Sequence, residues 1–211
     1  MQIRIEGFLL LKTFFLLSLA AMEITLYQTL EDRENPDQIE NEGPFFCRHK
    51  GAWLSGGYYF WDTHIELSHW WGETNYKQKG YVICRAYGIL DETCWDLHGN
   101  GNHLLEFEKV CKEMVNQGIA NSETLLVPNV IAFLRKTGKF PYKAIRALGV
   151  GSISPNQSIE GLVYRLKFIE TNKTFLDLRP AIQLCLFEKK GLSLKDYLIV
   201  FPDNYVESAY A

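Results

Sequence analysis

Residues 53–71 read WLSGGYYFWDTHIELSHWW, and this stretch decides how the chain is expected to fold. Its first half surrounds a glycine pair with large aromatic side chains, which is too dense an apolar cluster for a solvent-exposed loop. Over residues 65–71, apolar and aromatic side chains recur at helical spacing. We therefore expect a tightly packed segment followed by a helix, with the aromatic face of the helix inward and Asp62 or Thr63 as its N-cap.

The sequence on either side of this stretch contains patterns typical of strands and further helices. Residues 22–27 alternate polar and apolar side chains, which suits a strand with one buried face. Residues 81–90 are mostly apolar and β-rich, as in a second buried strand. Helical spacing recurs over 104–115 and, with a proline near its start, over 127–134. Further strand-like segments lie at 144–150, 161–169, 181–187 and 198–201. This order of elements predicts an α+β fold.

Length and composition indicate one folded domain. A chain of 211 residues fits a single hydrophobic core. With 47% hydrophobic and 14% aromatic residues, it has enough apolar surface to exclude a wholly disordered protein. The net charge of −3 removes the broad attraction to phosphate backbones that dedicated nucleic-acid-binding proteins use.

The cysteines and histidines form no recognisable framework. The five cysteines are widely spaced without a CxxC pair, so we expect reduced and mostly buried thiols. The five histidines form no HExxH or related ligand pattern, and no metal is expected. Arg48, His49 and Lys50 form a short basic run, which either is solvated surface or folds over a cleft to meet phosphates.

Residues 1–21 are interpreted as a hydrophobic extension, and the domain is expected to span residues 22–211. The extension is apolar from residue 7 onward and too short to cross a bilayer comfortably. Lys12 interrupts it, which departs from the signal-peptide pattern. We expect a cytoplasmic protein without stable membrane association, with export through this segment as the alternative and with Met1 or Met22 as the natural start.

Several segments together resemble a known family. Residues 53–60 and 65–71 resemble the WLGxGxYF…A..WW stretch of small bacterial ADP-ribosyltransferase-like proteins, itself similar to the GxGxYF stretch of poly-ADP-ribose polymerases. In the same order, residues 81–86 with 96–97 resemble the family's VIxA…LDL strand and loop. Residues 181–186 resemble its late HIQICV strand. The resemblance covers nearly the whole expected domain.

The resemblance implies an ADP-ribosyltransferase-like fold, in which two small curved β-sheets face each other across an NAD cleft with helices outside. The family's chemistry is substitution at the anomeric carbon of the nicotinamide ribose. Nicotinamide is the leaving group, and the transition state resembles an oxocarbenium ion. Such a site must hold the nicotinamide ring, fix the ribose and stabilise positive charge.

The resemblance also implies the residues of the site. Tyr59 is expected to stack on nicotinamide and Gln183 to hydrogen-bond the ribose, and both are taken as catalytic. Gln183 cannot act as a base, and Gln28 and Thr29 stand where the family has His or Arg and then Gly. The NAD-binding residues are expected to be Tyr27, Gln28, Thr29, Gly56, Gly57 and Tyr59. Each of the polar side chains also fits an ordinary position on a strand.

The leading hypothesis is a bacterial mono-ADP-ribosyltransferase that uses NAD to modify an intracellular protein or nucleic acid, as a toxin or phage-defence effector. Such a toxin would have an antitoxin or immunity partner. One alternative is an NAD glycohydrolase, in which water is the acceptor. Another, suggested by Gln28 and Thr29, is a catalytically silent domain that binds a nucleotide or a partner protein.

Overall fold

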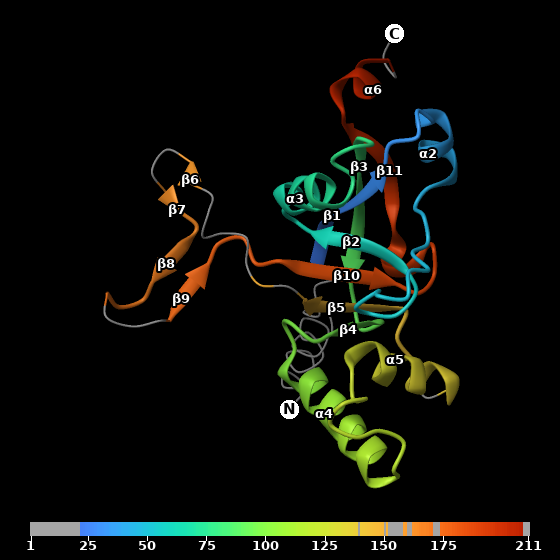
Figure 1. Ribbon diagram of the computed structural model, residues 1–211, viewed down its shortest axis with the longest axis vertical. Coiled ribbons are helices and arrows are strands. Elements are labelled where there is room, and N and C mark those ends of the chain that lie inside the picture. The colour runs from blue at the N-terminus through green and yellow to red at the C-terminus, as the bar shows by residue number, and fades with distance from the viewer. Residues whose placement is uncertain are drawn as a thin grey trace, which may run out of the picture.

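The computed structural model describes residues 22–138, 140–149, 151, 158–159, 162–170 and 174–208. Helices and strands mix around one main sheet (Figure 1), so the fold is α+β as predicted. The strands are β1 (Met22–Glu31), β2 (Tyr58–Asp62), β3 (Tyr81–Leu90), β4 (Cys94–Asp96), β5 (Ala144–Leu148), β6 (Ser158–Ile159), β7 (Leu162–Val163), β8 (Arg165–Lys167), β9 (Phe175–Asp177), β10 (Ile182–Leu186) and β11 (Lys195–Phe201). The helices are α2 (Pro36–Glu42), α3 (Ile65–Asn75), α4 (Gly101–Asn116), α5 (Val127–Lys136), the 3-10 turn η2 (Gly191–Ser193) and α6 (Asp203–Ser208).

The main sheet has seven strands in the order β11-β3-β1-β2-β10-β5-β4. All neighbours are antiparallel except β4 and β5. The sheet is continuous in its hydrogen bonding, whereas the sequence led us to expect two separate sheets. Its narrowest joint is the β1–β2 ladder, where only Leu26 with Asp62 and Tyr27 with Trp61 are paired. By contrast, β1 pairs with β3 along its whole length, from Met22 to Glu31.

The alternation in β1 places its apolar side chains in the core, as the sequence predicted. Ile24 and Leu26 are buried together with Phe60 of β2 and Leu184 of β10. Because neighbouring residues of a strand point to opposite faces, Tyr27 lies on the other face of the sheet, with Trp61 beside it. That second face carries Tyr27, Thr29, Tyr59 and Gln183, whereas Gln28 lies on the same face as Leu26.

Helix α3 covers the tyrosine-bearing face of β1 and β3, with Leu67 buried against Trp61. Its aromatic face points inward, as the spacing predicted. The predicted cap is wrong: the N-cap is His64, which makes no side-chain capping bond. Thr63 has a positive φ of 64° and its hydroxyl donates to Asp62 instead, so both expected capping side chains are used elsewhere.

Helices α4 and α5 pack at the β5–β4 end of the sheet, around Trp95 and Ile145. Strand β4, which holds Trp95, was not predicted. Helix α4 was expected to be a packing element, but Met114 is its one fully buried residue. Its Leu104 and Leu105 side chains are 50% and 64% exposed. At the opposite edge, α2 and α6 lie near β11 (Figure 1).

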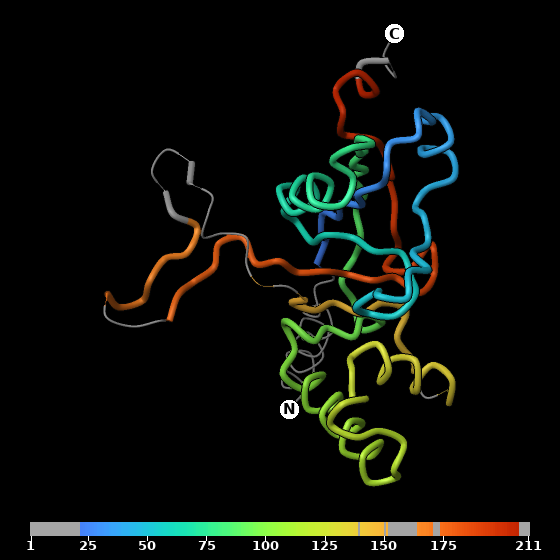
Figure 2. The backbone as a smooth tube through the Cα atoms, viewed as in Figure 1, coloured from blue at the N-terminus to red at the C-terminus, as the bar shows by residue number. Residues whose placement is uncertain are grey.

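Strands β6 to β9 form an arm that projects from the body between β5 and β10 (Figure 1), and Figure 2 shows the path of its β8 and β9 part. The strand expected at 161–169 is divided here between β7 and β8. The arm joins the sheet at one point, because Leu148 at the end of β5 is the direct partner of Ile182 at the start of β10. The core clusters of the body contain no residue of β8 or β9.

A candidate binding pocket between β1 and β2

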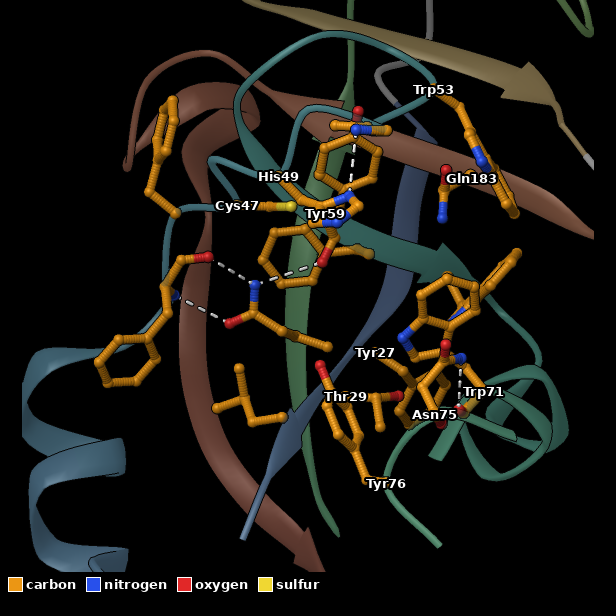
Figure 3. Close-up of a pocket in the computed structure, with 18 residues that line it drawn as sticks. Tyr27, Thr29, Cys47, His49, Trp53, Tyr59, Trp71, Asn75, Tyr76 and Gln183 are labelled. Atoms are coloured by element: carbon orange, nitrogen blue, oxygen red, sulfur yellow. Dashed lines mark hydrogen bonds between the residues drawn. The ribbon is translucent and has the colours of Figure 1, made fainter. Parts of the chain in front are cut away.

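A pocket of about 620 Å³ lies where β1 and β2 separate (Figure 3). Strand β2 runs beside β10, where Cys185 pairs with Tyr59 and Gln183 with Trp61, and it meets β1 only at its last two residues. Because this β1–β2 ladder is short, β1 and β2 diverge beyond it, and we call the space between them the wedge. Half of the 18 lining residues are aromatic. These aromatic residues are Tyr27, Phe45, Phe46, Trp53, Tyr59, Phe60, Trp61, Trp71 and Tyr76.

The structure gathers most of the residues singled out from the sequence. Tyr27, Gln28 and Thr29 of β1 line this pocket together with Tyr59 of β2 and Gln183 of β10. They come from three strands that are adjacent in the sheet, although the chain separates them by more than a hundred residues. Their placement agrees with the expectation of one common cleft. Their side chains differ in how many of their polar atoms already have hydrogen-bond partners within the protein.

Gln183 is the polar side chain with unused hydrogen-bonding capacity. It is 6% exposed and lies beside Trp53 in the pocket (Figure 3). Within the described residues, its Oε1 has no hydrogen-bond donor. A buried acceptor without a partner destabilises a fold by about 1–3 kcal/mol, and such groups are rare in native proteins. A donor on a ligand or a water molecule would satisfy Oε1.

Gln28, in contrast, has no free polar atom. Its Oε1 accepts from the Phe45 N–H at 2.9 Å and from the Tyr197 hydroxyl at 2.8 Å. Its Nε2 donates to the carbonyls of Phe45 at 3.0 Å and Tyr59 at 3.3 Å. An amide side chain has two donors and two acceptor lone pairs, so this set uses all of them. Gln28 thus bridges the wedge between β1 and β2, and its amide serves the protein rather than an expected ribose.

Tyr59 contributes its ring, because its hydroxyl is occupied. The hydroxyl accepts from the Leu54 N–H at 2.7 Å and donates to the Ser55 carbonyl at 2.6 Å. Burial raises the pKa of this phenol far above its usual range, so it stays neutral. The side chain therefore fixes the turn that precedes β2 and presents a neutral aromatic surface to the pocket.

Tyr27 and Thr29 lie on the pocket side of β1. Burial raises the pKa of the Tyr27 hydroxyl, with Arg85 acting in the opposite direction. The Thr29 hydroxyl donates to the Ser68 carbonyl of α3 at 3.1 Å. Thr29 therefore ties β1 to α3 where the family pattern has a glycine.

The glycine pair was expected to contact NAD, but it packs against other parts of the protein. Gly56 and Gly57 are outside the pocket lining. A Cβ on Gly57 would lie 2.3 Å from Cys185 Sγ and 2.6 Å from the Leu186 carbonyl oxygen. A Cβ on Gly56 would lie 3.2 Å from the Phe46 ring. The close approach that requires glycine is therefore to β10 and to Phe46, within the protein itself.

Several lining residues were not predicted as site residues. Trp53 and Trp71 line the pocket from opposite ends of the aromatic stretch, and Asn75 and Tyr76 line it from the end of α3. The dense aromatic composition of residues 53–71 was the signal for the two tryptophans. Of the basic run, His49 lines the pocket and Arg48 and Lys50 do not. The Gly51 N–H donates to His49 Nδ1 at 3.1 Å, which leaves Nε2 as the ring nitrogen that carries hydrogen in the neutral form.

The described part of the chain contributes no Asp, Glu, Lys or Arg to the pocket lining. The nearby Asp62 carboxylate is committed to a buried network in which Arg146 Nε lies 2.6 Å from Asp62 and Nη1 lies 3.1 Å from Asp96. Burial works against the charge of Arg146, but the two carboxylates outweigh it and raise its pKa. Asp62 follows Trp61 in β2, so its side chain starts toward the opposite face of the sheet. The site therefore offers aromatic surface, one unpartnered amide and His49, without a carboxylate base.

The described residues contain no cluster of three or more potential metal ligands. The five cysteines are free, and Cys84, Cys94 and Cys185 are buried. No helix within the described ranges has the length and apolar character needed to cross a membrane. Comparison with family profiles, curated proteins and solved structures found no match to this chain.

Proposed function

We propose that this protein binds NAD in the pocket between β1 and β2 and transfers ADP-ribose to an intracellular macromolecule. The single observation that supports this best is the buried, unpartnered Oε1 of Gln183 among aromatic rings. The ring of nicotinamide would lie against the aromatic surface, and a ribose hydroxyl would donate to Gln183. In this proposal Tyr59 and Gln183 are the catalytic pair, and the role is that of a toxin or defence effector.

The division of the sheet supports the ADP-ribosyltransferase-like fold that is part of this proposal. The two-residue ladder between β1 and β2 divides the sheet into a β11-β3-β1 half and a β2-β10-β5-β4 half. Two such halves that separate around a pocket are what an ADP-ribosyltransferase-like fold requires. We infer that each half corresponds to one of the two curved sheets of that fold.

In the reaction, the bond between the ribose anomeric carbon and the nicotinamide nitrogen breaks, and nicotinamide leaves with the electron pair. The developing cation would be stabilised by the Gln183 carbonyl oxygen, and the acceptor's nucleophile would then attack the anomeric carbon. No lining carboxylate is available to take the acceptor's proton. We therefore expect slow turnover, or an acceptor that gives up its proton readily.

The test is calorimetric titration of the full chain with NAD, beside an assay of nicotinamide release. Gln183→Leu should reduce turnover more than affinity, since a contact that strengthens in the transition state is lost from the rate. The same change should leave the folded state as stable or slightly more stable, because it removes an unpartnered acceptor. Gln183→Glu should raise nicotinamide release by placing negative charge beside the cation.

Gln117→Leu is the matched control, because Gln117 is exposed at the end of α4 and outside the pocket lining. Equal nicotinamide release by wild type, Gln183→Leu and Gln117→Leu would remove Gln183 from the reaction. Free ADP-ribose as the product, with no labelled macromolecule, would make the protein an NAD glycohydrolase instead.

A catalytically silent binding domain is the second candidate. It is favoured by the saturated amide of Gln28 and by a pocket lining without carboxylates. NAD binding without nicotinamide release, in wild type and in Gln183→Glu, would select this candidate.

A further inference from the structure

Three tryptophans from three different segments form one corner of the pocket. Trp53 precedes β2, Trp61 lies within β2, and Trp71 belongs to α3. The rings of Trp53 and Trp71 meet edge to face with centroids 5.8 Å apart, and those of Trp61 and Trp71 lie 6.2 Å apart at 59°. Tyr27 packs against the same cluster. We call these three residues the tryptophan corner.

The tryptophan corner is made of three indole rings, each of which also carries an N–H donor at its edge. The faces of aromatic rings carry partial negative charge, and an indole face attracts cations more strongly than other side-chain rings do. Gln183 lies beside Trp53, and its buried Oε1 adds a carbonyl dipole without a donor of its own among the described residues. This combination favours a positively charged guest over a neutral one of the same shape.

The charged side chains near the corner that affect Tyr27 lie outside the pocket lining. Among the residues that the structure describes, the lining includes no Asp, Glu, Lys or Arg. Burial raises the pKa of the Tyr27 hydroxyl; of the charges that act on it, Arg85 lowers it and Glu66 raises it. Glu66 itself pairs with Arg179 at 3.0 Å. Arg85 has a larger effect on the Tyr27 pKa than Glu66 does, so the preference for a cation has to come from the rings and the Gln183 oxygen.

We infer that the tryptophan corner selects a guest with a permanent positive charge, of the N-alkylpyridinium or quaternary ammonium class. The extension to NAD rests on the proposed function: only the oxidised form carries a pyridinium ring, and the reduced ring is neutral. The pocket then distinguishes oxidised from reduced NAD by charge as well as by reactivity.

The experiment compares ligands that differ mainly in this charge. The full chain is titrated with 1-methylnicotinamide, a cation, and with nicotinamide, which is neutral, and tryptophan fluorescence and heat are followed. Because the cation is desolvated against several rings, we expect 1-methylnicotinamide to bind about tenfold more tightly. NAD in its oxidised form should exceed the reduced form by a similar factor.

Variants assign the effect to the corner. Trp53→Leu and Trp71→Leu should each bring the two nicotinamides to within about threefold of one another, because each removes one indole face. Trp70→Leu is the matched control: Trp70 contacts Trp61 and Trp71, but it is outside the pocket lining. It should keep the preference, and thermal melting should show that all variants fold.

Equal or weaker binding of the cation, or an unchanged preference in both corner variants, would overturn the inference. A preference for 1-methylnicotinamide without any binding of oxidised NAD would uphold the inference and defeat the proposed function. Equal binding of oxidised and reduced NAD, with no preference between the small ligands, would overturn the inference and leave the proposed function standing. Absence of binding by every ligand would overturn both.

Discussion

At the residue scale, two glutamines in one pocket have opposite chemical situations. Gln28 uses all four hydrogen-bonding positions within the protein, and Gln183 has a buried oxygen without a described donor. Residue type alone cannot separate these cases, because both amides lie on strands among apolar side chains. The difference comes from Phe45 and Tyr197, which reach Gln28 from distant parts of the chain.

Replacing Gln28 should therefore destabilise the folded protein even when no ligand is bound. Gln28→Leu leaves the polar groups of Phe45, Tyr59 and Tyr197 without their partners, and we expect the free energy of unfolding to fall by about 3 kcal/mol. Urea unfolding measures this, with Gln117→Leu as the exposed control. A loss below about 0.5 kcal/mol would mean that Gln28 does not hold the wedge together.

At the element scale, the β2-β10-β5-β4 half of the sheet depends on contacts that cross between strands. Arg146 of β5 reaches over to Asp62 of β2 and Asp96 of β4. Glu106 of α4 accepts from Trp95 Nε1 at 3.0 Å and from the Tyr142 hydroxyl at 2.7 Å, which connects this exposed helix to the sheet. These contacts hold β2, β4, β5 and α4 in their mutual positions.

Arg146→Met should be strongly destabilising. It leaves two carboxylates, one of them 3% exposed, without their cation. Breaking a buried ion pair in this way costs about 3–5 kcal/mol. Arg33→Met is the control, because the Arg33 side chain is 72% exposed and its pair with Glu31 should contribute less than about 1 kcal/mol. Similar unfolding midpoints for the two variants would contradict the structural role of Arg146.

The contact between α4 and Tyr142 predicts a dependence of stability on alkaline pH. Burial and the neighbouring Glu106 raise the pKa of Tyr142 to about 12, whereas an unfolded tyrosine ionises near 10. The unfolded chain therefore loses this proton first, and stability should fall as the pH rises from about 10 through about 12. Tyr142→Phe should lose less stability over that window. Thermal melting of both proteins across this range is the measurement, and parallel curves would contradict the prediction.

At the scale of the whole molecule, the chain consists of a body and an arm. The sheet, its helices and the pocket form the body, and the strands β6 to β9 stand away from it (Figures 1 and 2). Leu148 and Ile182 are direct partners at the base of the arm. A tight turn could therefore join β5 to β10 without the arm.

Replacing residues 151–178 with a short glycine-rich turn should leave the body folded. Arg179 and Gln183 remain in place, and the core clusters lose no member from β8 or β9. We expect a cooperative thermal transition within a few degrees of wild type and unchanged tryptophan fluorescence. A non-cooperative transition would show that the arm is needed to fold the body.

The sequence by itself determined the elements that depend on local periodicity. These patterns lie within neighbouring residues: the alternation in β1, the β-rich apolar run of β3, the helical spacing of α3 and the proline at the start of α5. The α+β class followed from them, whereas the common placement of Tyr59 and Gln183 was expected from the resemblance to ADP-ribosyltransferase-like proteins. The short strand β4 and the N-cap of α3 could not be predicted, because parallel pairing with β5 and the positive φ of Thr63 are set by tertiary contacts.

Only the tertiary structure decided which polar atoms are free. Tyr197 reaches Gln28 across 169 positions of sequence, and the three tryptophans meet only after α3 folds against β2. Glycine at 56 and 57 could be read from the sequence, but the neighbour that requires Gly57 is Cys185 of β10. Hydrogen-bond capacity and close packing are shared between segments that are distant in the chain, so a linear pattern predicts which residues are present and not which of them remain available to a ligand.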